Sequence, residues 1–465
     1  MKDELKYLKS MEDKLALIKQ ELQDRRTVIK SNKGYLRNLG IYRLPVEIIR
    51  MILLFAHEEA DEEGVNDALT WSHISCGFRI VVRDTPGLWN TVSNTMHTKH
   101  LALSISRSGY LPLRVLINQG ERSIHWLLPG RPRVSEFLQM VMPFKNRWKS
   151  LFLRIRETDV FDVLETTHES AFLSLFREFE SSSLEELDIV YDEGSALQRS
   201  MTEEIDDLPT CLSSLCDEWN LPALKICRAV ECIPLPKNLE ALETLDLSLA
   251  NNWAKGWSFV TLCKLLERCV NLRNLILDFD LIISEDDFDE VETPVTVGKV
   301  ETLHVTVTHE VCDGDILKFM SLLRLPQLKD LTVVLDTDRC DLIDEVFDMC
   351  VPLYAVTEAD ITLRTFHLKI DGLEIDEDFM STLFGAVPRV DELVIEAPRT
   401  KFSLGSGSEV AVKTCNEVQL RKCIFKRCTH LNVRDAKHVE AYIRKCATRV
   451  VDFVYSCTCK FCDRE

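Results

Sequence analysis

Residues 242–252 read LETLDLSLANN, and this short pattern indicates the architecture of most of the chain. Leu242, Leu245 and Leu247 are spaced as apolar-x-x-apolar-x-apolar. The last two share one face of a β-strand, because side chains alternate along a strand. The other copies are Trp148/Leu151/Leu153, Leu184/Leu187/Ile189, Leu221/Leu224/Ile226, Leu272/Leu275/Leu277, Val300/Leu303/Val305, Leu328/Leu331/Val333, Leu363/Phe366/Leu368, Val390/Leu393/Ile395 and Val450/Phe453/Tyr455.

The spacing of these copies predicts alternating strands and helices. From Leu245 to Leu331 the middle residues are 30, 28 and 28 apart, which leaves room for one strand and one helix per unit. Helical periodicity appears between strands, in Phe259–Cys269, Gly314–Leu323 and Asp376–Ala386. Crossovers of this length return the chain in the same direction, so we expect α/β architecture with parallel strands in one curved sheet.

The body of the chain resembles an irregular leucine-rich repeat. Residues 242–252 are most similar to that repeat, with Asn251 near its usual Asn position. The resemblance implies a solenoid over residues 94–465, with a first strand near Leu111–Ile117. We expect Asp246 and Ser248 to line its solvent-open face, where acidic positions favour a basic target. A generic α/β body without a true solenoid stays an open alternative.

Residues 41–93, IYRLPVEIIRMILLFAHEEADEEGVNDALTWSHISCGFRIVVRDTPGLWNTVS, indicate a helical unit. Pro45 and Glu47 suit the first turn of a helix. Its apolar surface, from Ile48 to Phe55, is wider than a helix packed on one side needs. A second helical stretch is expected over Ala68–Val82. About 50 residues cannot bury this much apolar surface alone, so the pattern predicts a partner or a docked domain.

This stretch resembles the F-box. The residues that carry the resemblance are Leu44, Pro45, Glu47, Ile48 and Ile49, then Ser72–Arg79 (SHISCGFR), then Pro86, Leu88 and Trp89. Two positions depart from the family pattern, since Ser75 stands where Cys is usual and Phe78 where Trp is usual. The helix before this stretch and the acidic repeats after it are similar to the large F-box families of mushroom-type fungi.

The resemblance implies a three-helix F-box over residues 40–93 that binds the Skp-type adaptor of an SCF-type cullin–RING ubiquitin ligase. The implied adaptor-binding residues of the first helix are Leu44, Pro45, Ile48, Ile49, Ile52 and Leu53. Ile74, Phe78, Leu88 and Trp89 are expected to be shared between the core of the F-box and the interface. For each residue, core packing alone is the alternative.

The N-terminal 39 residues carry a heptad pattern. Leu8, Leu15, Leu22, Ile29 and Leu36 are spaced by seven, and Met11, Ile18 and Leu39 follow members of that series by three. The pattern predicts an amphipathic helix. Two readings stay open: a coiled coil that forms a homodimer through residues 1–33, and one helix packed on its own chain.

Charge excludes some classes of partner. The net charge is −19. Residues 1–40, 41–90 and 401–465 carry +4, −4 and +6, which leaves −25 on residues 91–400. Such an acidic body argues against binding the phosphate backbone of nucleic acid and favours a basic protein partner. Apolar stretches are far shorter than the roughly 20 residues of a membrane span, so we expect no membrane segment.

The cysteines indicate a reducing compartment. Their number, 17, is odd, and no Asn stands in a glycosylation acceptor, which predicts a cytoplasmic or nuclear protein. Cys457, Cys459 and Cys462, with Cys446 upstream, could share zinc, but no second CxxC or His pair accompanies them. Free thiols are therefore the favoured reading, and we expect no metal or cofactor.

Together these patterns predict a non-enzymatic substrate receptor of a ubiquitin ligase. The F-box would bind the adaptor, and the solenoid would hold an unknown protein target. No nucleophile motif or HExxH is present, so no catalytic residue is expected. One alternative is a protein-interaction scaffold outside any ligase. Another is a hydrolase or transferase site assembled in the body from distant positions.

Overall fold

The computed structural model describes most of the repeats and part of the N-terminal region. The described residues are 44–59, 63–119, 131–156, 176, 179–192, 216–250, 258–280, 294–308, 313–336, 363–371, 374–375, 379–380, 383–384, 389–398, 401–402, 419–428, 431, 433–446 and 452–456, with nine positions between 9 and 27. The chain divides into two compact units, one of Met1–Thr91 with Leu103–Leu111 and one of Val92–Ala102 with Pro112–Glu465.

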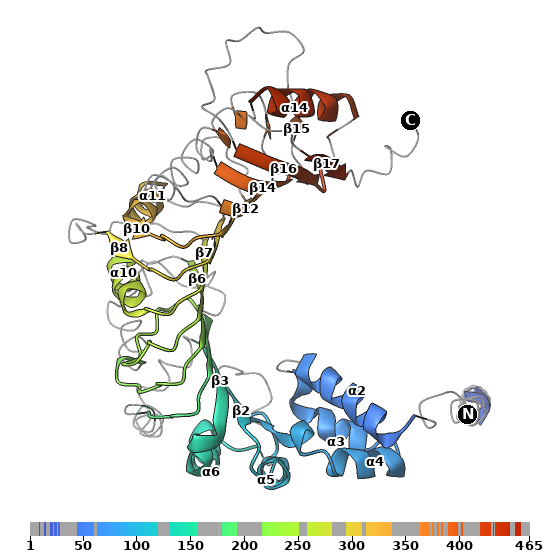
Figure 1. The fold of residues 1–465 in the computed structure, drawn as a ribbon. Helices are drawn as coiled ribbons and strands as arrows, with labels where there is room; N and C mark the ends of the chain where they lie inside the picture. Colours follow the sequence, from blue (N-terminus) through green and yellow to red (C-terminus); the bar gives the residue numbers. More distant parts are fainter. Residues whose placement is uncertain are drawn as a thin grey trace. The chain divides into compact units, whose positions relative to one another are not determined.

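The first unit is helical. Helices α2 (Val46–Glu59), α3 (Asp67–Ser72) and α4 (Cys76–Arg83) are joined and followed by 3-10 turns η2 (Glu63–Asn66) and η3 (Pro86–Trp89) (Figure 1). Their shared core consists of Leu53, Ala68, Val81, Val82, Leu88 and Trp89, with Ile49, Leu54, Trp71, Phe78 and Leu103 packed against it. Residues from all three helices and η3 therefore enclose one apolar center.

The expected single helix over Ala68–Val82 is wrong, because it breaks into α3 and α4. Helix α3 ends at Ser72, and Ser75 adopts an extended conformation as the N-cap of α4. Its Oγ accepts a hydrogen bond from the backbone N–H of Phe78 at 3.2 Å. A serine hydroxyl satisfies one of the backbone donors that a helix start leaves free, so Ser75 begins a new helix.

The second unit is built on one 13-stranded sheet. In spatial order its strands are β1 (Thr91–Ser93), β2 (Leu113–Gln119), β3 (Trp148–Arg156), β4 (Glu186–Asp192), β5 (Ile226–Val230), β6 (Thr244–Ala250), β7 (Asn274–Asp280), β9 (Thr302–Val307), β11 (Asp330–Asp336), β12 (Leu363–Asp371), β14 (Arg389–Glu396), β16 (Gln419–Lys426) and β17 (Asp452–Ser456). Strands β2 to β17 pair in parallel with their neighbours. The fold is mixed α/β with a large parallel sheet.

The predicted placement of the triplets side by side in one parallel sheet is confirmed for its middle strands. Leu245, Leu275, Leu303 and Leu331 pair in one continuous row across β6, β7, β9 and β11. All four are buried, whereas Asp246 lies on the opposite face and is partly exposed. Side-chain alternation therefore places the leucines and the polar residues on different faces of the same strands.

Helices cover the leucine face. Helix α10 (Phe259–Arg268) and helix α11 (Asp313–Leu322) lie on one side of the strands (Figure 1). The ring of Phe259 in α10 lies 5.9 Å from that of Phe279 in β7 and 5.3 Å from that of Phe319 in α11. The expected helices at Phe259–Cys269 and Gly314–Leu323 are confirmed to within one residue at each end. In Asp376–Ala386, the described Phe379, Met380, Leu383 and Phe384 are helical and buried.

Further helices occur in the connections between neighbouring strands near the two ends of the sheet. They are α5 (Thr98–Arg107), α6 (Val134–Val141), the 3-10 helix η5 (Met142–Arg147) and α14 (Val433–Cys446). Two short parallel pairs lie outside the main sheet, β8 (Val295–Thr296) with β10 (Leu323–Arg324) and β13 (Glu374–Ile375) with β15 (Lys401–Phe402). Among the described residues no helix is both long and apolar enough to cross a membrane.

Two repeat assignments need correction, and one copy was not predicted. In Leu221/Leu224/Ile226 the inward strand residues are Cys227 and Ala229, which pair with Leu245 and Leu247, while Ile226 is only partly buried. A copy at Leu420/Cys423/Phe425 in β16 was not expected, yet it pairs with Val390/Leu393/Ile395. In both copies cysteine or alanine replaces a large aliphatic residue, so the hydrophobic pattern is weak. At the end of the sheet, Tyr455 of β17 is 42% exposed rather than buried.

Charged residues at the starts of several strands pair across the sheet. Lys149 Nζ lies 3.9 Å and Lys225 Nζ 3.4 Å from the carboxylate of Glu185. Lys329 Nζ lies 2.9 Å from Glu301 Oε2. Each pair is partly solvent-exposed and contributes little to stability, but opposite charges on neighbouring strands favour this register over a shifted one.

Candidate functional site

Helix α2 has two apolar sides, and the described residues cover only one of them. Leu53 lies in the core of the helical unit, and Ile49 and Leu54 pack against it. Four other residues, Ile48, Met51, Ile52 and Phe55, are 40%, 65%, 51% and 67% exposed. Their spacing of three and four places them on one face of the helix, which we call the outer stripe.

Other apolar residues of the helical unit are also exposed. They include Leu44 and Val46 at the start of α2, Ile74 before α4, and Ile80 in α4. Isolated exposed hydrophobic residues are normal on a protein surface. The outer stripe is different, because four large side chains are exposed side by side on one helix. A contiguous apolar surface of this kind is typical of a protein–protein interface.

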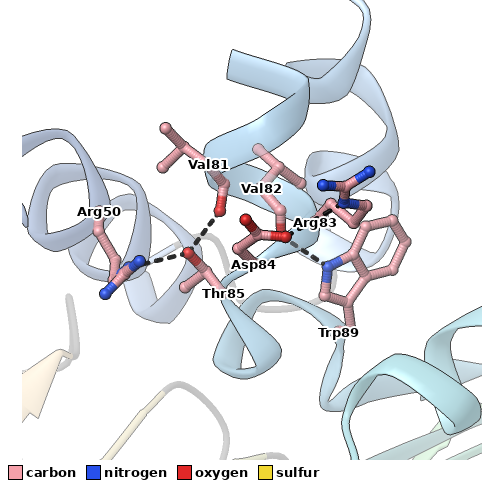
Figure 2. Close-up of polar contacts among 7 residues, drawn as sticks. All are labelled: Arg50, Val81, Val82, Arg83, Asp84, Thr85 and Trp89. Carbon is pink, nitrogen blue, oxygen red and sulfur yellow. Dashed lines mark hydrogen bonds and ion pairs between the residues drawn. The ribbon is translucent and has the colours of Figure 1, made fainter. Parts of the chain in front are cut away.

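Hydrogen bonds begin helix α2 and connect it to the residues that follow α4. The carbonyl of Pro45 accepts from the N–H of Ile48 and of Ile49, at 3.0 and 3.1 Å, and so begins α2. Arg50 Nε donates to Thr85 Oγ1 at 3.2 Å (Figure 2). Thr85 Oγ1 in turn donates to the carbonyl of Val81 at 2.6 Å. Because Arg50 precedes Met51 and Ile52 directly, this link fixes the rotation of α2 that turns the outer stripe away from the core.

Hydrogen bonds also hold the 3-10 turn η3 against the end of α4. Trp89 Nε1 donates to the carbonyl of Val82 at 2.8 Å, and Arg83 Nε donates to Asp84 Oδ1 at 3.1 Å (Figure 2). Arg107 lies over the Trp89 ring, 4.4 Å from its centroid. The N–H of the buried indole therefore has the hydrogen-bond partner that buried tryptophans usually find, and the cation against its face adds a favourable contact.

The ten residues expected to bind the adaptor fall into three groups. Leu44, Pro45, Ile48, Ile52 and Ile74 are exposed, and Ile49 and Phe78 are partly buried. Leu53, expected as a contact of the first helix, is instead a core residue, and so are Leu88 and Trp89. Sequence reasoning did not include Met51 or Ile80, and it used Phe55 only for the width of the apolar surface. The spacing of Met51 and Phe55 from Ile48 was the available signal.

One ionisable cluster lies beside the helical core. Burial raises the pKa of Asp67, and nearby His57 opposes this shift. His57 Nε2 lies 3.2 Å from Thr91 Oγ1, and its ring lies edge-on to Trp71 with centroids 6.4 Å apart. These contacts join the end of α2 to α3 and to the end of the unit, so their role is structural.

The sheet offers a second surface. On β6 the side chains opposite the leucines are Thr244, Asp246 and Ser248, all partly exposed, as expected for Asp246 and Ser248. Burial raises the pKa of Asp246, an effect opposed by Arg228 and His304. This face is therefore polar and accessible, unlike the apolar outer stripe.

The described residues contain no cluster of three or more His, Cys, Asp or Glu side chains that could hold a metal ion. Cys457, Cys459 and Cys462 lie outside the described residues, as do Leu8, Leu15, Leu22, Ile29 and Leu36 of the heptad pattern. The nine described positions between 9 and 27 are helical and exposed. In the body, burial raises the pKa of the Cys216, Cys227 and Cys232 thiols, so these cysteines stay protonated and unreactive.

In comparisons with known proteins, no protein-family model matches the chain and no curated protein is significantly similar to it.

Proposed function

We propose that the protein is a substrate receptor of an SCF-type cullin–RING ubiquitin ligase, with the helical unit as an F-box that binds the Skp-type adaptor. The observation that carries the proposal is the outer stripe of α2. The stripe begins at Ile48, within Leu44-Pro45-x-Glu47-Ile48-Ile49, the residues that most resemble the F-box pattern. Sequence resemblance and exposed apolar surface thus coincide on the same helix.

The proposed adaptor contacts are the exposed residues rather than the buried ones. Leu44, Pro45, Ile48 and Ile52 have apolar surface left to bury, and the structure adds Met51 and Phe55. Leu53, Leu88 and Trp89 support the interface by building the core beneath it. Aromatic and large aliphatic anchors at the centre of an interface usually carry most of its binding energy.

The proposed mechanism is proximity. The helical unit tethers the chain to the ligase, and the repeat unit holds a target protein. Tethering raises the local concentration of target lysines near the ubiquitin-loaded enzyme. The chemical steps belong to other subunits, and we assign no catalytic group to this chain. The predicted location, cytoplasm or nucleus, is part of the same proposal.

The test is direct binding of the full chain to a purified Skp-type adaptor by isothermal titration calorimetry. Phe55→Asp places a charge on the outer stripe and should reduce affinity at least a hundredfold. Val270→Asp is the matched control, because Val270 is 56% exposed but lies next to α10 in the other unit. The control should bind like wild type.

Two results would contradict the proposal. One is a folded wild-type chain that does not bind the adaptor, which would favour a scaffold outside any ligase. The other is a Phe55→Asp variant that binds as tightly as wild type. Circular dichroism of both variants establishes that each is folded before its affinity is interpreted.

A further inference from the structure

The open face of β6, β7 and β9 carries an acidic surface. Asp246 on β6, Asp278 and Asp280 on β7, and His304 on β9 are all partly exposed on the face opposite the leucines. Ser248 pairs with Asp278, and Asp278 with Thr306, so the charged side chains alternate with hydroxyl groups across the strands. We call these four charged or titratable residues the acidic strip.

Elsewhere on the same face, carboxylates are paired with cations of the next strand. Asp188 lies 3.9 Å from Arg228, and Glu392 lies 3.5 Å from Lys422. The carboxylates of the acidic strip have fewer cationic residues opposite them on the neighbouring strands. Arg228 pairs in register with Asp246, but the strand partners of Asp278 and Asp280 are Ser248, Thr306 and Ala250, none of them cationic.

His304 does not supply the missing charge. Burial lowers its pKa, the positive charge of Lys369 adds to this effect, and together they outweigh the opposing influence of Asp278 and Asp246. A histidine whose pKa is below its ordinary value of 6.5 is mostly neutral at pH 7. Its Nε2 lies 3.2 Å from Thr306 Oγ1. At neutral pH His304 therefore adds little positive charge to the acidic strip.

Asp278 is the most poorly satisfied member of the strip. Burial raises its pKa, with Asp280 and Asp246 adding to the effect, while Ser248 donates a hydrogen bond. Its Oδ1 is buried and has no hydrogen-bond partner among the described residues. Asp280, in contrast, accepts from Thr308 Oγ1. A cation bound beside the partly exposed Asp278 side chain would stabilise its ionised carboxylate.

We propose that the acidic strip binds lysine or arginine side chains of an extended segment in the protein that the ligase recruits. The inference rests on the proposed function, since it names the target class for the repeat unit. Asp278 and Asp280 are two residues apart on one strand, about 6.8 Å. Alternate residues of an extended peptide are separated by about the same distance, so cations at positions i and i+2 can face both carboxylates.

The charge of the whole region supports the same partner. Residues 91–400 carry −25, so the surrounding field attracts basic segments and repels acidic ones. This negative charge alone does not define a fixed binding site for a basic segment. The strip adds one, because burial of Asp246 and Asp278 strengthens their interaction with a bound cation relative to fully hydrated carboxylates.

The experiment measures fluorescence anisotropy of labelled ten-residue peptides with the full chain. One peptide has lysine at alternate positions, and its counterparts have glutamate or serine there. We expect the lysine peptide to bind and the other two not to bind. Asp278→Asn with Asp280→Asn should weaken binding about tenfold, because both charges are lost while shape is kept.

The matched control is Glu185→Gln with Glu301→Gln. It removes the same net charge from residues that pair with lysines at the strand starts. It should change affinity less than twofold. Equal weakening by both double variants would overturn the proposal, because attraction by net charge would then explain the binding. Equal binding of the lysine and serine peptides would overturn it as well.

Adaptor binding in the same preparations separates this inference from the proposed function. If the chain binds the adaptor but not the lysine peptide, the inference fails and the proposed function stands. If the chain binds the lysine peptide through the strip but not the adaptor, the strip is a basic-segment site and its role in a ligase is refuted. The double aspartate variant should bind the adaptor as wild type does.

Discussion

Ile52 and Leu53 are neighbours in α2 with opposite environments, and they give a sharp test of the two-sided helix. Ile52 is 51% exposed on the outer stripe, whereas Leu53 is 6% exposed in the core. Replacing each by alanine removes similar amounts of apolar side chain. The two variants should therefore separate the stability of the helical unit from its ability to bind a partner.

The expected magnitudes follow from burial. Leu53→Ala leaves a cavity between α2 and α4 and should cost about 2–5 kcal/mol of unfolding free energy. Ile52→Ala should change stability by less than about 0.5 kcal/mol, because the side chain is half exposed and alanine favours the helix. In complex with a partner, the exposed half of Ile52 would contribute about 1 kcal/mol, so its loss should weaken adaptor binding about fivefold.

Hydrogen exchange followed by mass spectrometry is the suitable stability assay, since peptides from α2 and α4 report on the helical unit alone. Leu53→Ala should accelerate exchange in both helices, and Ile52→Ala should not. Calorimetry with the adaptor gives the affinities. Equal acceleration by both variants, or none by Leu53→Ala, would show that α2 is not packed as described.

Three further predictions follow from single residues. Ser75→Ala removes the hydroxyl that caps α4 and should cost about 1 kcal/mol, measured as faster exchange in α4, with Ser75→Asp as a variant that keeps a cap. Burial raises the pKa of Asp278 above its unfolded value of 3.8, so the folded state binds a proton more readily and loses stability as pH rises through that window. Asp278→Asn should therefore raise the urea midpoint at pH 7, and the gain should vanish below about pH 4; a gain of equal size at both pH values would show that the ionised form is not the cause. If residues 1–33 form a dimer, Leu15→Glu should give a monomer in light scattering, and a wild type already monomeric at tens of micromolar would leave only packing on its own chain.

The repeat pattern was sufficient to predict the parallel sheet. Every second residue of a strand faces the same way, so Leu245 and Leu247 indicated both the strand and its inward face. The regular spacing of later copies indicated crossovers long enough for a helix. The prediction failed at Cys227, Ala229 and Cys423, because small residues carry too weak a hydrophobic signal to fix a strand's register. There, pairing with the neighbouring strand decides which side chains turn inward.

In the helical unit, too, the sequence determined some features and the tertiary structure decided others. The sequence alone determined that α2 is more apolar than one-sided packing needs, since local composition and the helical period suffice for that inference. Only the tertiary structure decided which apolar side is covered. Leu53 is buried because α3, α4 and η3 close over it, while Ile52, Met51 and Phe55 meet no other part of the described chain's core. Burial depends on contacts between residues distant in sequence, and the period of a single helix does not encode them.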